Sequence, residues 1–236
     1  MARQPILNVI TLRRLKTLPW ASDQQLEQLL AHMTLKQVDR RTLLFSEGAV
    51  SDTLYLLISG VVKLSLPTVE GEEILVSLVC PGEFFGITSL MSGTTRGFHC
   101  EAFSDCWVAG MRPNTFVTTL LGIPFAHFSE LMGSTISRWE ELLYRYTRFQ
   151  GLGLRQRLAM ALLELSQKFG VQDARGTILL LQVTHEDLAD LVGASRQKVT
   201  EHMKELERRQ VILREGRKLI VNPQRLQEVT GFFQEG

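Results

Sequence analysis

The first pattern along the chain is an apolar stripe at helical spacing near the N-terminus. Ser22 is a helix-capping residue type, and the apolar residues after it recur every three or four positions. We therefore expect a short amphipathic helix that buries one face. The stripe comprises Leu26, Leu29, Leu30 and Met33.

From Thr42 to Gly110 the pattern changes to short apolar runs that are typical of β-strands. The runs LLF, TLYLLI, VVKLSL, EILVSLV and CWVAG are separated by EG, SG and PGE turns. This spacing predicts a small antiparallel roll. The interior of such a sandwich or barrel can hold one small ligand.

A longer helical pattern runs from Pro124 to about Phe149. Its apolar residues alternate at spacings of four and three, as in a coiled-coil seam. Either this seam packs on the roll of its own chain, or a second face does so and the seam is left for a partner chain. We favour the second alternative, a homodimer. The seam is Phe128, Met132, Thr135, Trp139, Leu142, Tyr146 and Phe149, and the second face is Leu131, Ile136 and Leu143.

A second domain begins after the glycines at positions 151 and 153. A further amphipathic helix is expected there from Arg155 to Phe169, with Leu158, Leu162 and Leu165 on one side.

Two short helical patterns joined by a glycine turn come next, in VTHEDLADLVGASRQKVTEHMKELERR. Thr184 is the expected N-cap of the first helix, with Asp187 three residues later, and Gly193 ends it. Ser195 is the expected N-cap of the second. The arrangement predicts a helix-turn-helix. Its apolar faces are Leu188, Ala189 and Val192 in the first helix and Val199, Met203 and Leu206 in the second.

The outward face of the second helix carries groups that can read DNA bases. Arginine pairs with guanine, glutamine with adenine, and glutamate accepts from cytosine, each contact being worth roughly 1–3 kcal/mol of discrimination. A lone charged helix is usually a solvated face with local ion pairs, so the interpretation depends on the segment that comes after this helix. The candidate base contacts are Arg196, Gln197, Thr200, Glu201, Lys204 and Arg208.

That segment is a hairpin with a cationic tip. VILREGRKLIVN predicts two strands around a Glu215-Gly216 turn, flanked by Arg214, Arg217 and Lys218. Such a hairpin is the wing of a winged helix. From position 196 to 218 the chain has eight Lys or Arg against four Glu, an excess suited to binding phosphate. The expected phosphate contacts are Thr184, Ser195, Arg217 and Lys218.

The composition is that of a globular protein, and the length allows one large domain or two ordinary ones, of which we expect two. The chain has 236 residues, 44% hydrophobic and 22% charged, with a net charge of +1. No apolar run approaches the roughly 18 residues of a membrane helix, and no secretory pattern follows the first basic residues. Cys80, Cys100 and Cys106 do not form a disulfide pattern, which fits a reducing compartment. We expect a cytoplasmic protein with no membrane partner.

Taken together, these motifs resemble the cyclic-AMP receptor and fumarate-nitrate regulator (CRP/FNR) family of bacterial transcription regulators. The resemblance covers nearly the whole chain and is carried by PGEFFG, RLAMALLEL and, most specifically, THEDLADLVGASRQKV. It implies an α+β fold with an N-terminal antiparallel, jelly-roll-like β-roll of the cyclic-nucleotide-binding-domain type. A long central dimerisation helix and a C-terminal winged helix-turn-helix complete the implied fold.

The resemblance also implies a domain division and partners. The expected division is an effector-binding roll over 1–123, a dimerisation helix over 124–150 and a DNA-binding domain over 151–236. The implied partners are a second copy of the chain, double-stranded DNA with a palindromic site, and RNA polymerase. Arg196 matches the base-reading arginine of the family, whereas Glu201 stands where another arginine is common. The half-site is therefore expected to differ from the usual one.

Cyclic AMP is disfavoured as the effector. In the family's cyclic-nucleotide binders, the glycine of the phosphate-side turn is followed by a glutamate, and an Arg-Ser pair receives the phosphate. Here Ile87 follows Gly86, and Gly97 follows Arg96. A site built on buried hydrogen bonds loses much of its affinity without those partners. The polar pair that meets the adenine is likewise replaced by Leu142 and Leu143.

The stretch FGITSL followed by Arg96 is closer to the 2-oxoglutarate-sensing nitrogen-control members. In those, turn amides and two arginines hold the dicarboxylate, and the second arginine falls here at Arg138. We hypothesise a small anionic effector such as 2-oxoglutarate. The alternatives are a cyclic nucleotide, or no effector, with both arginines at the surface or in dimer ion pairs. The predicted effector site is Phe85, Gly86, Ile87, Thr88, Arg96 and Arg138.

Other chemistries are disfavoured. The iron-sulfur members of the family need four cysteines, mostly N-terminal, and none precedes Cys80 here. His99 and Cys100 are adjacent, and adjacent strand residues point to opposite faces, so they are poor joint haem ligands. We find no nucleophile-base pairing, phosphate-cradling glycine loop or paired-histidine motif, and predict neither an enzyme nor a metal or cofactor. The remaining alternative is a ligand-binding module whose winged helix contacts protein.

Overall fold

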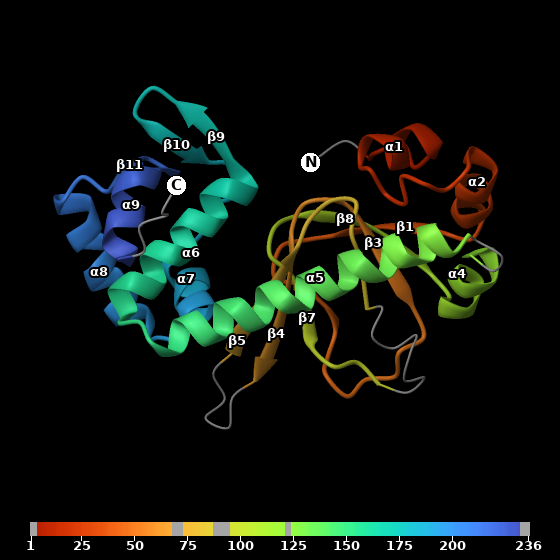
Figure 1. Cartoon of the computed structure of the whole chain (residues 1–236), viewed down its shortest axis with the longest axis horizontal. Coiled ribbons are helices and arrows are strands. Elements are labelled where there is room, and N and C mark those ends of the chain that lie inside the picture. The colour runs from red at the N-terminus through yellow and green to blue at the C-terminus, as the bar shows by residue number, and fades with distance from the viewer. Residues whose placement is uncertain (1–3, 68–72, 87–94, 121–123, 232–236) are drawn as a thin grey trace. The chain divides into compact units, whose positions relative to one another are not determined.

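The computed structural model describes residues 4–67, 73–86, 95–120 and 124–231 (Figure 1). The chain divides into two compact units, the first comprising residues 1–67 and 76–142 and the second residues 68–75 and 143–236. Each unit is considered by itself. Among the described residues, no helix has both the length and the apolar character that spanning a bilayer requires.

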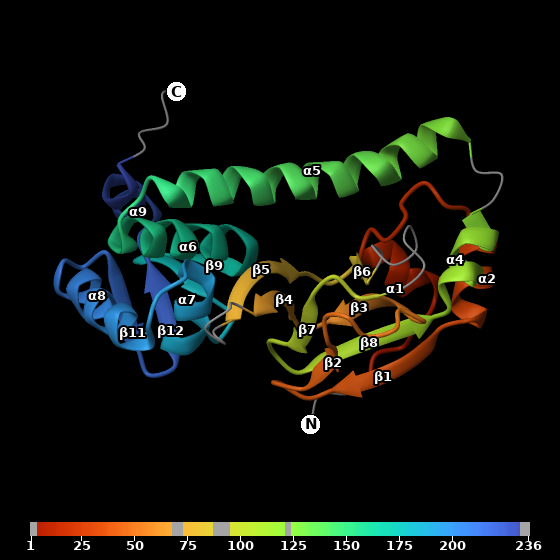
Figure 2. The ribbon, with the colours of Figure 1, turned by 90° about the horizontal axis from the view of Figure 1, so that it is seen from below.

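Two four-stranded antiparallel sheets form the N-terminal roll (Figure 2). Their strand orders are β1-β8-β3-β6 and β2-β7-β4-β5. Strands far apart in the sequence pair with each other, as where Thr34 of β1 lies opposite Gly110 of β8. The predicted antiparallel roll is confirmed, and β1, β6 and β7 are additions to the predicted runs. The strands are β1 (Thr34–Val38), β2 (Leu43–Phe45), β3 (Leu54–Ser59), β4 (Val62–Pro67), β5 (Glu73–Val79), β6 (Phe84–Phe85), β7 (His99–Ala102) and β8 (Cys106–Met111).

Side chains of β3 alternate between two hydrophobic clusters, as the two-residue period of a strand requires. Leu57 belongs to the interior of the roll, with buried residues from both sheets such as Val108 of β8 and Cys100 of β7. Leu54 and Leu56 face the opposite way. Both faces of the sheet are therefore covered, one by the second sheet and one by helices.

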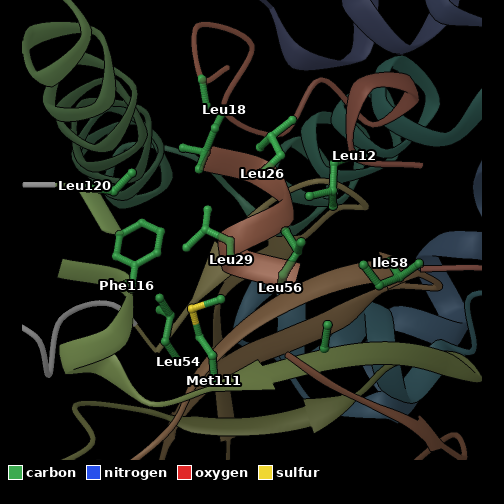
Figure 3. Close-up of a cluster of buried hydrophobic side chains, with 12 residues drawn as sticks. Leu12, Leu18, Leu26, Leu29, Leu54, Leu56, Ile58, Met111, Phe116 and Leu120 are labelled. Carbon is green, nitrogen blue, oxygen red and sulfur yellow. The ribbon is translucent and has the colours of Figure 1, made fainter. Parts of the chain in front are cut away.

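The helical cover consists of α1 (Val9–Arg14), α2 (Asp23–Ala31) and α4 (Pro113–Leu120). Figure 3 shows Leu12, Leu29 and Phe116, one from each helix, gathered with the strand leucines. Helix α2 confirms the predicted N-terminal helix, because Ser22 is its N-cap in a capping box with Gln25. Leu26 and Leu29 are buried, while Leu30 and Met33 are partly buried against the same cluster.

Helix α5 (Phe125–Gln150) is the predicted central helix and has 26 residues. After it, α6 (Leu154–Phe169) begins at Gly153 and buries Leu158, Leu162 and Leu165, as its spacing predicted.

The second unit builds a winged helix-turn-helix on α6. Helices α7 (His185–Val192), α8 (Arg196–Arg208) and α9 (Pro223–Thr230) surround α6, and α9 packs directly against it. A four-stranded antiparallel sheet has the order β11-β12-β10-β9. The predicted wing forms its β11-β12 end, and the β9-β10 hairpin is an addition. The strands are β9 (Gly170–Asp173), β10 (Gly176–Leu179), β11 (Ile212–Glu215) and β12 (Lys218–Val221).

Candidate nucleic-acid interface and ligand pocket

The helix-turn-helix is held by local caps. The Thr184 hydroxyl accepts from the backbone N–H of Asp187, and the Asp187 carboxylate accepts from the backbone N–H of Thr184 at 2.8 Å. Gly193 ends α7 with a φ of 62°, a left-handed conformation that suits glycine. Ser195 caps α8 by accepting from the backbone N–H of Lys198. These caps set the direction of α8 as it leaves the turn.

The face of α8 opposite its buried residues presents polar groups. Val199, Met203 and Leu206 are buried, and the 3.6-residue period turns the intervening side chains outward. Thr200 is half-buried, and its hydroxyl donates to the backbone oxygen of Arg196 at 2.8 Å. Thr200 therefore lies beside the outward face rather than on it. The exposed candidates are Arg196, Gln197, Glu201, Lys204 and Arg208.

The wing presents two exposed cations beside its turn. Gly216 has a φ of 58°, and Arg217 and Lys218 flank it on the exposed side. The neighbouring hairpin contributes Arg175, which pairs with Asp173 at 2.9 Å and also with Glu215 of the wing. Glu215 is thus engaged with another cation, which lessens its repulsion of a phosphate.

Arg214 was predicted to flank the cationic tip of the wing, but its contacts are with the helices. Its side chain turns toward the helices, where Nε lies 3.4 Å from Glu207 Oε1 and Nη2 lies 3.1 Å from His185 Nε2. On its other side, His185 Nδ1 lies 2.9 Å from Thr200 Oγ1. Sequence reasoning missed this role of His185. The only local sign of this role in the sequence is that His185 directly follows the predicted N-cap Thr184.

A cavity of about 360 Å³ lies within the first unit. Sequence reasoning missed two stretches that contribute to it, the segment before α2 and the turn before β6. The helix α5, which was expected to contribute through Arg138, contributes other side chains. The lining of the cavity is Lys16, Leu18, Pro19, Trp20, Phe45, Leu64, Val76, Ser77, Gly82, Glu83, Phe84, Phe85, Gly86, Arg96, Gly97, Phe98, Glu130, Trp139 and Leu142.

Arg96 is a buried cation in this lining, with 4% of its surface exposed. Its Nη2 donates to the backbone oxygen of Thr53 at 2.7 Å, and its guanidinium lies over the Phe45 ring at 4.2 Å. Its Nε has no hydrogen-bond partner among the described residues. Burial lowers the pKa of Arg96, against the opposite influence of Tyr55 and Asp52. A guanidinium remains charged in proteins, so this one favours an anion in the cavity.

Gly86 makes close approach of this guanidinium possible. Its φ is +76°, and a Cβ there would lie 2.4 Å from Arg96 Nη1. The predicted residues Phe85, Gly86 and Arg96 therefore come together in the cavity wall. Ile87 and Thr88 lie outside the described residues, as does the side chain of Arg138.

The seam residues of α5 divide between two surroundings. Trp139 and Leu142 line the cavity, whereas Tyr146 is 65% exposed. Ile136 and Leu143 are 56% and 62% exposed, so the prediction that their face packs on the roll is wrong. Helical spacing alone does not say which of two apolar stripes faces the sheet. Phe149 is half-buried, and the side chains of Phe128, Leu131, Met132 and Thr135 lie outside the described residues.

Each of the two units matches a known domain family. Residues 156–229 match the Crp-like helix-turn-helix domain, and residues 35–132 match the cyclic nucleotide-binding domain. The Global nitrogen regulator of Synechococcus elongatus is 28% identical over 195 residues, which is 81% of this chain and 87% of that protein. Transcriptional regulator SdrP of Thermus thermophilus is 32% identical over 157 residues, 66% of this chain and 73% of that protein.

A solved structure agrees with these relatives. The crystal structure of a CRP/FNR-family transcriptional regulator from Thermus thermophilus has a TM-score of 0.65 at 26% identity, covering 84% of this chain and 99% of that chain. A cyclic-nucleotide-binding-type roll followed by a Crp-like helix-turn-helix defines a DNA-binding transcription regulator, not an enzyme. The chain belongs to the CRP/FNR family of these regulators.

Proposed function

We propose that the protein works as a homodimer that binds a palindromic DNA site through α8 and the wing, under control of a small anionic effector. The observation that carries the DNA-binding part is the exposed polar face of α8, together with the exposed cations of the wing. The other face of α8 is buried and anchors the helix. A rigid helix with amide and guanidinium groups on one side is suited to the major groove.

The proposed contacts fall into two groups. Arg196, at the start of α8, is 3.9 Å from Glu186, and both side chains are mostly exposed. An exposed pair of this kind is weak, so the guanidinium is available for a base. The proposed base-reading set is Arg196, Gln197, Glu201, Lys204 and Arg208, with Thr200 supporting it, and the proposed phosphate contacts are Thr184, Ser195, Arg217 and Lys218.

Binding of a duplex through phosphates predicts strong salt dependence. For six or more phosphate contacts by the dimer, affinity should fall roughly 10³-fold or more between about 50 and 200 mM salt. Fluorescence anisotropy with a labelled palindromic probe and a scrambled probe measures this. Equal binding to both probes, or a flat salt response, would contradict the proposal and favour a protein partner for the winged helix.

The proposed dimer forms through α5. The described part of this helix leaves large apolar side chains in contact with water in the single chain, including Ile136, Trp139, Leu143 and Tyr146. A partner helix would cover them, so the proposed interface combines Trp139 and Tyr146 of the predicted seam with residues of the second face. Sedimentation should give twice the chain mass of 26.7 kDa, and Tyr146→Asp should shift the protein toward monomer. A wild-type monomer at operator-binding concentrations would remove this part of the proposal.

The proposed effector site is the cavity around Arg96, with 2-oxoglutarate as the first candidate. The buried guanidinium, whose Nε is unpaired within the described part of the chain, supports an anionic ligand, and a nitrogen regulator is among the relatives. Glu83 and Glu130 also line the cavity and would repel a second carboxylate near them, so the ligand would place its anionic group toward Arg96. Cyclic nucleotides, after which the family of the roll is named, are the alternative.

Isothermal titration with 2-oxoglutarate, cyclic AMP and buffer alone tests the effector proposal. Arg96→Met should abolish the heat of binding while the chain still folds. If neither compound binds the wild-type protein, the effector proposal fails while the DNA-binding proposal stands.

Further assignments depend on the proposed role. We propose the functional division 1–123, 124–150 and 151–236, with RNA polymerase as an additional partner. A regulator of transcription acts at the chromosome, and we therefore propose the cytoplasm as its location.

A further inference from the structure

The imidazole of His185 connects the three parts of the proposed DNA-binding surface, which are α7, α8 and the wing. His185 is the first residue of α7, and its ring lies between Thr200 of α8 and Arg214 of β11. Arg214 reaches α8 as well, through Glu207. The two helices and the wing are thus connected by a series of side-chain hydrogen bonds with a titratable group, His185, in its middle.

The proton positions in this chain follow from the donors. An arginine only donates, so Nε2 of His185 accepts from Arg214 Nη2 at 3.1 Å and carries no proton. A neutral imidazole must then carry its proton on Nδ1, which donates to the Thr200 hydroxyl at 2.9 Å. The Thr200 hydroxyl in turn donates a hydrogen bond to the backbone oxygen of Arg196 at 2.8 Å. Every donor has an acceptor only while His185 is neutral.

The charges around the ring also favour the neutral form. Burial lowers the pKa of His185 most, followed by the cation of Arg214, while Arg196 and Lys204 lower it further. Glu207 acts in the opposite direction. The ring is therefore neutral at pH 7, and it takes up a proton at a lower pH than an ordinary histidine does.

We propose that neutral His185 is a positioning residue that aligns the wing with the recognition helix for one DNA duplex. It does so by accepting from Arg214 while it donates to Thr200. In a protonated ring Nε2 also becomes a donor and faces the cation of Arg214, so Arg214 must leave it and the wing loses its attachment to α7. The inference rests on the proposal that α8 and the wing bind the same duplex.

The sign of the pH effect separates this role from a direct contact. A histidine that touched phosphate would bind DNA better when protonated, since the charge attracts the anion. A positioning residue that must accept from Arg214 acts the other way. Operator affinity should fall roughly 3- to 10-fold between about pH 7.5 and 5.5, the scale of one ordinary hydrogen bond, because the Arg214 side chain is partly exposed to water.

The test measures operator affinity by anisotropy at fixed ionic strength across this pH range, in the wild type and in three variants. His185→Gln removes the titration, so its profile should be flat and its affinity near neutral pH several-fold below wild type. His202→Gln is the matched control, because His202 is also a half-buried histidine of the same unit and pairs with Glu205 instead. It should keep the wild-type profile. Arg217→Ala should weaken binding at every pH.

The outcomes are distinct. If His185→Gln keeps the wild-type profile, or if acidification strengthens binding by the wild type and not by this variant, the positioning role is overturned. If instead Arg217→Ala binds the operator as the wild type does and with the same salt response, then the proposed DNA contact of the wing fails. Circular dichroism of each variant checks that a loss of affinity does not come from unfolding.

Discussion

Replacing Gly86 with alanine tests the link between the backbone of the cavity wall and the position of Arg96. Gly86 has a φ of +76°, and an added Cβ would lie 2.4 Å from Arg96 Nη1. The contacted atom is the end of a long side chain, but that side chain is buried against Phe45. The guanidinium therefore has to move away from the wall to admit the methyl group.

The expected magnitude has two parts. Holding an alanine in the left-handed region costs about 1–2 kcal/mol. The hydrogen bond from Arg96 to the Gly86 oxygen is long, 3.4 Å, so its loss adds about 0.5 kcal/mol. The free energy of unfolding of the first unit should therefore fall by about 1.5–2.5 kcal/mol. Displacing the guanidinium should also weaken anion binding at least about 10-fold, since bidentate pairing depends on geometry.

Urea unfolding followed by tryptophan fluorescence measures the stability part. All three tryptophans, at positions 20, 107 and 139, lie in the first unit, so the signal reports on that unit alone. Gly97→Ala is the matched control, because Gly97 lines the same cavity, has no left-handed φ and has open space around its Cβ position. It should change stability by less than about 0.5 kcal/mol or increase it slightly. If both variants lose the same stability, or Gly86→Ala unfolds like wild type, the reasoning is refuted.

Three further predictions concern the DNA-binding unit and the cysteines. Leu206→Ala empties a fully buried site in the second unit and should destabilise that unit by about 2–5 kcal/mol; an unchanged thermal transition by circular dichroism would contradict this. Arg196→Ala should reduce discrimination between operator and scrambled DNA by about 1–3 kcal/mol, and an unchanged ratio of the two dissociation constants would count against base reading. Burial raises the pKa of Cys100 and of Cys106, so a thiol reagent at pH 8 should modify Cys80 alone in the native protein and all three after denaturation.

Much of the winged helix could be predicted because its determinants are local. The caps at Thr184 and Ser195 act on backbone groups within three residues. The buried stripe of α8 recurs at a period that the sequence displays directly. The hairpin turn at Gly216 is likewise a property of neighbouring residues.

The candidate ligand pocket was only partly predictable. Gly86 and Arg96 were expected in it from a resemblance, yet nothing local showed that Lys16 and Trp20, far earlier in the chain, complete its wall. The choice between the two apolar stripes of α5 likewise could not be made from local sequence. Both stripes have helical spacing, and only packing against the roll brings Trp139 to the cavity and leaves Ile136 exposed.

By itself, then, the sequence determined many of the helices and strands of this regulator and the two faces of its recognition helix, because caps, turns and periodicity depend on residues a few positions apart. Only the tertiary structure decided that Arg96 is buried over Phe45, with no partner for its Nε in the described ranges, and that His185 meets Arg214. The surroundings of a charged or titratable group are made by segments far apart along the chain. Their chemistry becomes defined only when folding brings those segments together.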